Sequence, residues 1–190
     1  MLEDLLLHTC CGPCGLYAAT KLREDGYDVT LFFYNPNIFP DEEYQKRLSA
    51  IKEWADKNNF EFVIGEYNHN DWLKSVAGLE KEPEGGARCS VCFSLRLEGA
   101  AKYAKENNFE IFATTLTSGR NKKADIINPI GLGLAEKYGL KFYEADWKKG
   151  GGQEESRKMA QECDIYRQHY CGCEFSISTD ETRIFTDKRR

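Results

Sequence analysis

Eight cysteines are distributed unevenly along the 190 residues of this chain. Three of them fall within five positions, in the segment 8–14 (HTCCGPC). A pair follows in Cys89-Ser90-Val91-Cys92, and another in Cys171-Gly172-Cys173. Thiolates bind zinc, iron and iron–sulfur clusters, and paired thiols also exchange disulfides. The spacing therefore predicts a thiolate-bound metal centre or a redox centre as the active site.

The rest of the sequence favours metal or redox use over structural disulfides. No apolar stretch is long enough to cross a bilayer, and the first apolar segment is too short for a secretory signal. We therefore expect a cytoplasmic protein without a membrane partner, in a compartment where disulfides are rare. With 41% hydrophobic residues, a chain of this length also forms a core without such cross-links.

The three clusters together supply more thiols than one four-ligand site needs. This predicts either two metal centres or one centre with additional catalytic thiols. Cys163 is the exception, because it follows Met159 by four residues on a predicted helix and is expected in the core. The predicted metal ligands are Cys10, Cys11, Cys14, Cys89, Cys92, Cys171 and Cys173.

Alternating strands and helices must position these thiols. Continuous apolar runs predict strands at 5–9, 29–34, 60–65, 110–115 and 140–145. Helical spacing predicts helices at 12–23, after Asp41, from Asp71 to Gly78, at 90–107, at 124–138 with a break at Pro129, and from 150 to about 163. This order predicts an α/β fold in a single domain over 1–190: a parallel five-stranded sheet with helices on both faces, and an irregular C-terminal segment, 164–190.

In parallel sheets of this kind, ligands bind beyond the carboxyl ends of the strands. Cys10, Cys11 and Cys14 directly follow the first predicted strand, where the first turn of the next helix lowers thiol pKa values. His8 precedes them as a possible ligand or supporting group, and Asp146 follows the fifth strand as an acid, a ligand or a cap. We expect His8 and Asp146 to be the catalytic side chains.

Basic side chains lie in loops and helix starts near the same edge. The net charge of −5 argues against nucleic-acid binding by the whole surface but leaves room for a local basic rim. Aromatic side chains near the edge could stack on an unpaired base, namely Tyr34, Phe39, Trp147 and Tyr170. The predicted phosphate-contacting residues are Arg120, Lys122, Lys123, Lys148 and Lys149, although solvated surface is an equally good interpretation.

Three other functions compete with a catalytic metal centre. Cys11-Gly12-Pro13-Cys14 matches the active-site motif of thioredoxins, but Cys10 and two more clusters go beyond what that chemistry needs. A binding module whose fold is stabilised by a structural zinc ion is disfavoured, because a core of this size is stable without one. An ATP-pyrophosphatase would place a glycine-rich phosphate loop where this chain has 8–14.

The cysteine segments, with the motifs between them, resemble the QueH-type family of epoxyqueuosine reductases. The resemblance is carried in order by HTCCGPC, CSVCF followed by Arg96, ATTL, ADWKKGGG and YRQHYCGCEFS, over residues 8–176. One departure is the loop after ATTL, where a Ser-Pro-His-Lys-like run is expected and the chain reads 118–123 as SGRNKK.

The resemblance implies a fold like that of adenine-nucleotide alpha hydrolases (HUP-like) and reduction of epoxyqueuosine to queuosine at the tRNA wobble position without cobalamin. It implies a [4Fe–4S] cluster, a second mononuclear iron, a tRNA partner and an electron donor that the sequence does not identify. We hypothesise that Cys89 and Cys92 bind the cluster with Cys10 or Cys11 and with Cys171 or Cys173. The remaining thiols would then bind the second iron.

Overall fold

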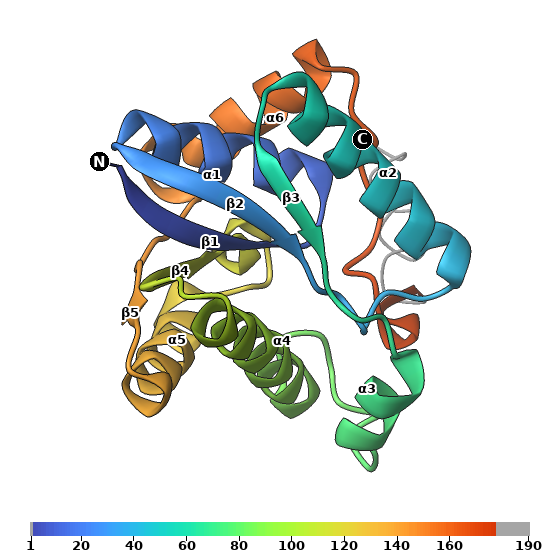
Figure 1. Cartoon of the computed structure of the whole chain (residues 1–190). Helices are drawn as coiled ribbons and strands as arrows, with labels where there is room; N and C mark the ends of the chain where they lie inside the picture. The colour runs from blue at the N-terminus through green and yellow to red at the C-terminus, as the bar shows by residue number, and fades with distance from the viewer. Residues whose placement is uncertain (1, 178–190) are drawn as a thin grey trace.

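The protein is built on one sheet of five parallel strands, as expected (Figure 1). The computed structural model describes residues 2–177. The strands lie in the order β3-β2-β1-β4-β5. Their bounds are β1 Glu3–Thr9, β2 Tyr27–Phe33, β3 Glu61–Ile64, β4 Ile111–Thr114 and β5 Lys141–Phe142.

Helices cover both faces of this sheet. In Figure 1, α1, α2 and α6 lie on one side of the strands, and α4 and α5 lie on the other. The bounds are α1 Gly12–Glu24, α2 Asp41–Lys57, α3 His69–Ser75, α4 Ala87–Glu106, α5 Ala124–Tyr138 and α6 Gly152–Glu162, with short 3₁₀ turns at Leu116–Ser118, Lys149–Gly151 and Glu174–Ser176. No helix in this part of the chain is long and apolar enough to span a bilayer.

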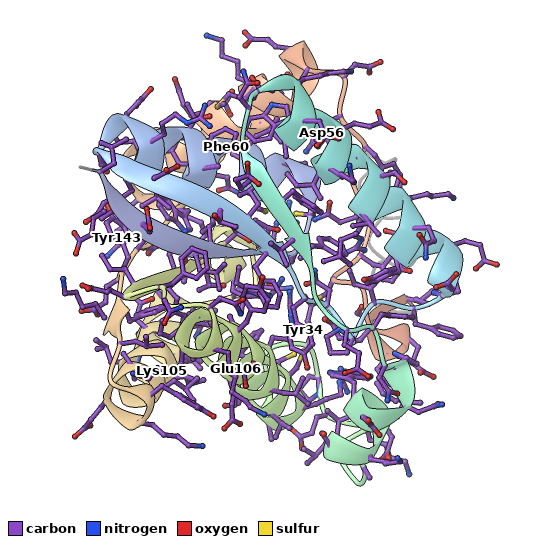
Figure 2. The ribbon with its side chains drawn as sticks, viewed as in Figure 1. Tyr34, Asp56, Phe60, Lys105, Glu106 and Tyr143 are labelled. Atoms are coloured by element: carbon purple, nitrogen blue, oxygen red, sulfur yellow. The ribbon has the colours of Figure 1, made fainter. Side chains whose placement is uncertain are left out.

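Successive residues of β1 explain why both faces need covering. Leu5 and Leu7 pack into one apolar cluster with residues of α1 and α2, whereas Leu6 packs into another with residues of α4 and α5. All three leucines are fully buried. Because side chains alternate across a strand, a continuous apolar run such as LLL requires a core on each side. Figure 2 shows side chains filling the space on both sides of the strands.

The direction in which successive strands are added to the sheet reverses between β1 and β4. β1 pairs in parallel with β2 on one side and with β4 on the other. The chain therefore winds outward in two directions from this pair, which opens a crevice at their carboxyl ends. Cys10 follows β1 at this point, and Thr115 follows β4.

Three local expectations were wrong. Pro129 does not break its helix: α5 runs without interruption, because the proline is exposed while Ile127 and Gly131 keep the helix packed. The fifth strand is only two residues long and ends before Asp146. Cys163 is exposed rather than buried, because α6 ends at Glu162 and leaves this cysteine as its C-cap.

Candidate metal centre

Three thiols meet directly beyond β1. The sulfur atoms of Cys10, Cys11 and Cys14 (the triad) all lie within 4.8 Å of one another. The Sγ atoms of Cys10 and Cys11 are 4.0 Å apart, and the Thr115 hydroxyl donates to Cys10 at 3.7 Å. Three sulfurs around one tetrahedral metal with bonds of about 2.3 Å would lie about 3.8 Å apart, so the spacing fits a single ion.

The surroundings of the triad favour the thiolate form of Cys10. Hydrogen bonds from Cys11 and Cys14 hold the pKa of Cys10 well below its ordinary value, although burial opposes them. The same contact to Cys10 raises the pKa of Cys11 to about 11. Cys11 is the N-cap of α1, so the positive end of that helix also faces the sulfurs. One anionic sulfur supported by two S–H donors is a ready metal-binding arrangement.

The other four predicted ligands gather nearby in a looser set. Burial raises the pKa of Cys89, Cys92 and Cys173, to about 11 for Cys173, and in each case charge on Cys171 adds to the increase. Cys92 and Cys173 also share one small apolar cluster. Within residues 2–177, only the triad has three ligand atoms within 4.8 Å of one another. The four-thiol group (Cys89, Cys92, Cys171 and Cys173) is therefore more widely spaced.

Two cations interact with cysteines of both the triad and the four-thiol group. Burial alone would lower the pKa of Arg96, but Cys92, Cys10 and Cys171 outweigh it and raise the value. Lys122 behaves in the same way: burial opposes its charge, while Cys171 and Cys10 raise its pKa. Two cations that each sense both thiol groups would offset the negative charge of several thiolates.

Arg47 fastens the segment that carries Cys171. It is 2% exposed and forms an ion pair with Glu43 at 2.7 Å. Its two terminal nitrogens donate to the carbonyls of Cys171 (3.0 Å) and Tyr170 (3.1 Å). Gly172 adjoins this clamp with a φ of +128°, and a Cβ there would lie 3.1 Å from Arg47 Nη1. The segment is thus held by the buried guanidinium group of Arg47 and by a backbone turn that requires glycine.

Two further buried arginines support the other cysteines from one face of α4, where Arg88, Cys92 and Arg96 are each four residues apart. Arg88 donates to the carbonyls of Leu79, Glu80 and Glu82 in the loop before Cys89. Arg96 donates to Asn35 Oδ1, and Asn35 donates in turn to the carbonyl of Thr9 at 2.8 Å. Thr9 directly precedes the triad, so α4 is joined to both thiol groups.

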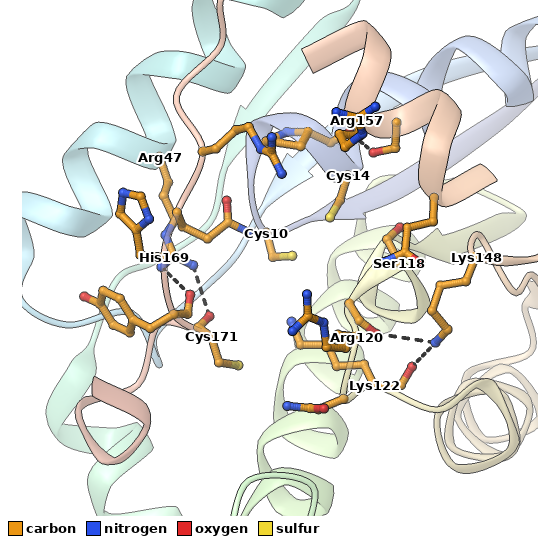
Figure 3. A pocket seen from close by; sticks show the side chains of 18 of the residues that line it. Cys10, Cys14, Arg47, Ser118, Arg120, Lys122, Lys148, Arg157, His169 and Cys171 are labelled. Atoms are coloured by element: carbon orange, nitrogen blue, oxygen red, sulfur yellow. Dashed lines mark hydrogen bonds between the residues drawn. The ribbon is translucent and has the colours of Figure 1, made fainter. Parts of the chain in front are cut away.

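A cleft of about 670 Å³ opens onto both thiol groups. Cys10, Cys14 and Cys171 line it, and Figure 3 shows these three side chains facing one opening, with Arg120 and Lys122 beside it. Arg157 and Tyr170 also line the cleft. The cleft can therefore admit a molecule of small-ligand size next to the thiols.

His8 lies behind the thiols, where both of its ring nitrogens are bonded. Nε2 is 3.0 Å from the carbonyl oxygen of Tyr34, and Nδ1 is 2.8 Å from Thr114 Oγ1. A carbonyl only accepts, so Nε2 carries the proton and Nδ1 accepts from the hydroxyl. Burial lowers the pKa of His8 to about 3. This geometry supports the positioning interpretation of His8, and its catalytic part stays a prediction.

Asp146 faces a different hollow from the cleft. It lines a shallow depression with Asp125 and Lys149, and its Oδ1 accepts from the backbone N–H of Lys148 at 3.3 Å. Its carboxylate lies 3.8 Å from the Lys148 ammonium and 3.9 Å from that of Lys149. The strand ends too early to carry Asp146 to the thiols. Of the three alternatives the geometry supports the cap, while its catalytic part stays a prediction.

The predicted basic residues separate into two sets. Arg120, Lys122 and Lys148 line the cleft, whereas Lys149 lines the hollow beside Asp146. Lys123 is exposed and is the N-cap of α5. The Lys148 ammonium donates to the carbonyls of Gly119 and Lys122, so it holds the loop that carries Lys122. Their contacts with phosphate stay a prediction.

The aromatic residues also divide. Tyr170 lines the cleft. Trp147 is buried and donates its ring N–H to the Thr114 carbonyl, and Tyr34 packs against Gly99, so both belong to the core. Phe39 is 39% exposed and stacks on His69.

Sequence reasoning missed the buried arginines as supports of the site. A signal was present: Arg47 lies on the apolar face of α2 defined by Tyr44 and Ile51, and Arg88 and Arg96 flank Cys92 at helical spacing. A charged residue on the apolar face of a helix is buried only where a hydrogen-bonding or oppositely charged partner compensates it. This pattern therefore predicts that Arg47, Arg88 and Arg96 are buried and hydrogen-bonded to other segments.

The fold and the thiols together define a class: a parallel α/β protein that carries cysteines at the crevice beyond β1 and β4. The whole fold is similar to that of a protein from Methanocaldococcus jannaschii described as a predicted subunit of tRNA methyltransferase. That likeness has a TM-score of 0.59 and 16% identity, over 98% of this chain and 88% of the other. It supports the fold alone.

The family follows from closer relatives. Residues 5–179 match the family model for epoxyqueuosine reductase QueH, and the chain belongs to this family. It is 38% identical to the QueH of Acinetobacter baylyi over 176 residues, 92% of this chain and 81% of that protein. It is also 38% identical to the QueH of Thermotoga maritima over 176 residues, 91% of this chain and 90% of that protein. These comparisons favour the reductase over the thioredoxin alternative.

Proposed function

We propose that this protein reduces epoxyqueuosine to queuosine in tRNA, without cobalamin and in the cytoplasm. The observation that carries the proposal is the gathering of seven cysteines at the β1–β4 crevice, three of which line one cleft, in a chain of the QueH family. The reaction opens an epoxide to an alkene and releases its oxygen as water. It consumes two electrons and two protons, and the electrons come from a donor protein or small reductant.

The two thiol groups fit two different metal centres. Three sulfurs within 4.8 Å suit a single iron, with a fourth position left for substrate. The four-thiol group suits a [4Fe–4S] cluster, because a cluster is larger than one ion and needs its four ligands further apart. This division revises our hypothesis that Cys10 or Cys11 joins Cys89 and Cys92. It supports Cys89, Cys92, Cys171 and Cys173 on the cluster.

When bound, the cluster would supply electrons singly and the second iron would act as a Lewis acid toward the epoxide oxygen. The chain itself binds and orients the substrate. Arg96 and Lys122 balance the charge of the thiolates, and the buried arginines hold the cysteine segments at fixed separation.

The tRNA would reach the cleft by turning its wobble base out of the anticodon loop, as enzymes that modify bases do. Tyr170 lines the cleft and offers a ring for stacking. Arg120 and Arg167 are exposed at the same opening and could contact the flanking phosphates.

Cysteine substitutions test the function together with the division of ligands. Protein purified without oxygen is analysed for iron and acid-labile sulfide and then assayed on tRNA that carries epoxyqueuosine. For the wild type we expect about four sulfides and about five irons. Cys92→Ser should lose most iron and sulfide. Cys14→Ser should lose about one iron and keep the sulfide, and both variants should be inactive.

Cys163→Ser is the matched control, because this cysteine is exposed and outside both groups. Its iron, sulfide and activity should equal those of the wild type. Loss of sulfide in Cys14→Ser would contradict the division, while wild-type protein with an intact cluster and no activity would contradict the reductase itself.

A further inference from the structure

Glu84 is an unpaired carboxylate in a basic cleft. It lines the cleft together with six arginine and lysine side chains, namely Arg47, Arg120, Lys122, Lys148, Arg157 and Arg167. The other carboxylate there, Glu154, is paired with Arg157. Glu84 Oε2 is buried and has no hydrogen-bond partner within residues 2–177. A carboxylate left unpaired among so many cations is available to a ligand.

Two of the cleft cations have partners of their own rather than Glu84. Arg47 is bonded to Glu43 and to two carbonyls, and Lys148 is bonded to the loop 119–122. Gly85, the next residue after Glu84, donates its N–H to Cys89 Sγ at 3.2 Å. The carboxylate is therefore carried by a segment that is fixed beside the four-thiol group.

The substrate offers a matching charge. Epoxyqueuosine has a secondary amine on the ring carbon next to the epoxide, and an alkylamine of this kind is protonated at neutral pH. When the epoxide lies at the metal centre, this ammonium lies two or three bonds from the reacting carbons. It would be repelled by the arginines and lysines of the cleft unless an anion received it.

We propose that Glu84 is a specificity-determining residue whose carboxylate pairs with the secondary ammonium of the modified base; this inference rests on the proposed function. The pair selects wobble bases that carry the amine over unmodified guanine and places the epoxide toward the thiols. Two more buried oxygens, Ser118 Oγ and Gln168 Oε1, line the same cleft. They have no hydrogen-bond partner in the described part of the chain and are available to the ring hydroxyls.

Binding of short RNA tests the pairing independently of turnover. Metal-loaded full-length protein is titrated with anticodon stem–loops that carry queuosine, N-acetylated queuosine or guanosine at the wobble position. Queuosine keeps the amine but lacks the epoxide, so nothing reacts, and acetylation removes the charge. We expect the wild type to bind the queuosine stem–loop at least about tenfold more tightly than either other RNA.

Glu84→Gln should reduce this preference to about twofold or less, while Glu84→Asp keeps part of it. Glu80→Gln is the matched control: it removes one charge from the same loop at an exposed position outside the cleft lining, and it should keep the full preference. Iron and sulfide contents verify that each variant is folded. The wild type's response to acetylation requires no variant at all.

Equal binding of the three RNAs by the wild type, or an undiminished preference in Glu84→Gln, would overturn the inference. A parallel reductase assay separates this failure from that of the function. An active wild type whose preference does not depend on Glu84 refutes the ammonium pairing alone. An inactive, cluster-containing wild type whose preference does depend on Glu84 refutes the reductase and leaves the pairing in place.

Discussion

The triad and the four-thiol group meet at one cleft but are positioned in different ways. The triad follows β1 directly and enters α1, so regular backbone fixes all three sulfurs. The four-thiol group joins the start of α4 to the irregular segment around Gly172, and buried arginines hold each part: Arg47 bonds the segment to α2, and Arg88 bonds the loop before α4. One group depends on local structure, and the other depends on charged side chains that reach across the molecule.

The largest effect should come from removing the clamp on Cys171. Arg47→Met leaves Glu43 buried without its partner and frees the carbonyls of Tyr170 and Cys171. We expect a loss of about 3–5 kcal/mol in the free energy of unfolding. Sulfide should be lost with the clamp, while the triad keeps its ability to bind one metal ion. Chemical denaturation and metal analysis measure both.

Lys52→Ala is the control for Arg47, because Lys52 forms an ion pair of the same spacing with Asp56 on the exposed side of α2. Its cost should be about 0.5 kcal/mol or less. If Arg47→Met retained full sulfide content, the arginine clamp would not be what positions the four-thiol group.

A smaller effect is expected at Gly172. An alanine there must adopt a φ near +128° and approach Arg47 and Ile38 to 3.1 Å. Gly172→Ala should lower stability by about 1–3 kcal/mol and reduce cluster content. Gly26→Ala separates the two causes, because Gly26 also has a positive φ, +94°, but nothing lies within 4 Å of its Cβ position. A Gly26 variant that loses as much sulfide would rule out a local effect at the cysteines.

The smallest effect concerns the two lysines after β5. The Lys148 side chain is 24% exposed and holds the loop 119–122, whereas that of Lys149 is 83% exposed. Lys148→Met should weaken tRNA binding about tenfold by releasing this loop, and Lys149→Met should change it about twofold or less. Filter binding at low and high salt measures both. Equal losses would mean that both lysines act as simple phosphate contacts.

The difference between the locally fixed triad and the four-thiol group also explains what the sequence could predict. β1, α1 and the triad follow from an apolar run that leads into closely spaced cysteines, and each is correct within a few residues. The arrangement of the seven thiols in two groups involves Arg47 and Arg96, whose partners are distant in sequence, so the proposed division of ligands could not be read from the pattern. Cys163 is exposed because α6 ends earlier than its pattern indicates, and Asp146 lies in a separate hollow because β5 ends early, while its catalytic part stays a prediction.

The position of Cys171 and Cys173 late in the chain has a consequence for biosynthesis. A ribosome delivers residues in order, so β1 to β5 and the triad emerge before the segment that completes the four-thiol group. Under the proposed division of ligands, a nascent or truncated chain that lacks this segment has the triad but only two of the four cluster ligands. Cluster insertion would then wait for translation to pass Cys173, and an incomplete chain would lack the proposed redox centre.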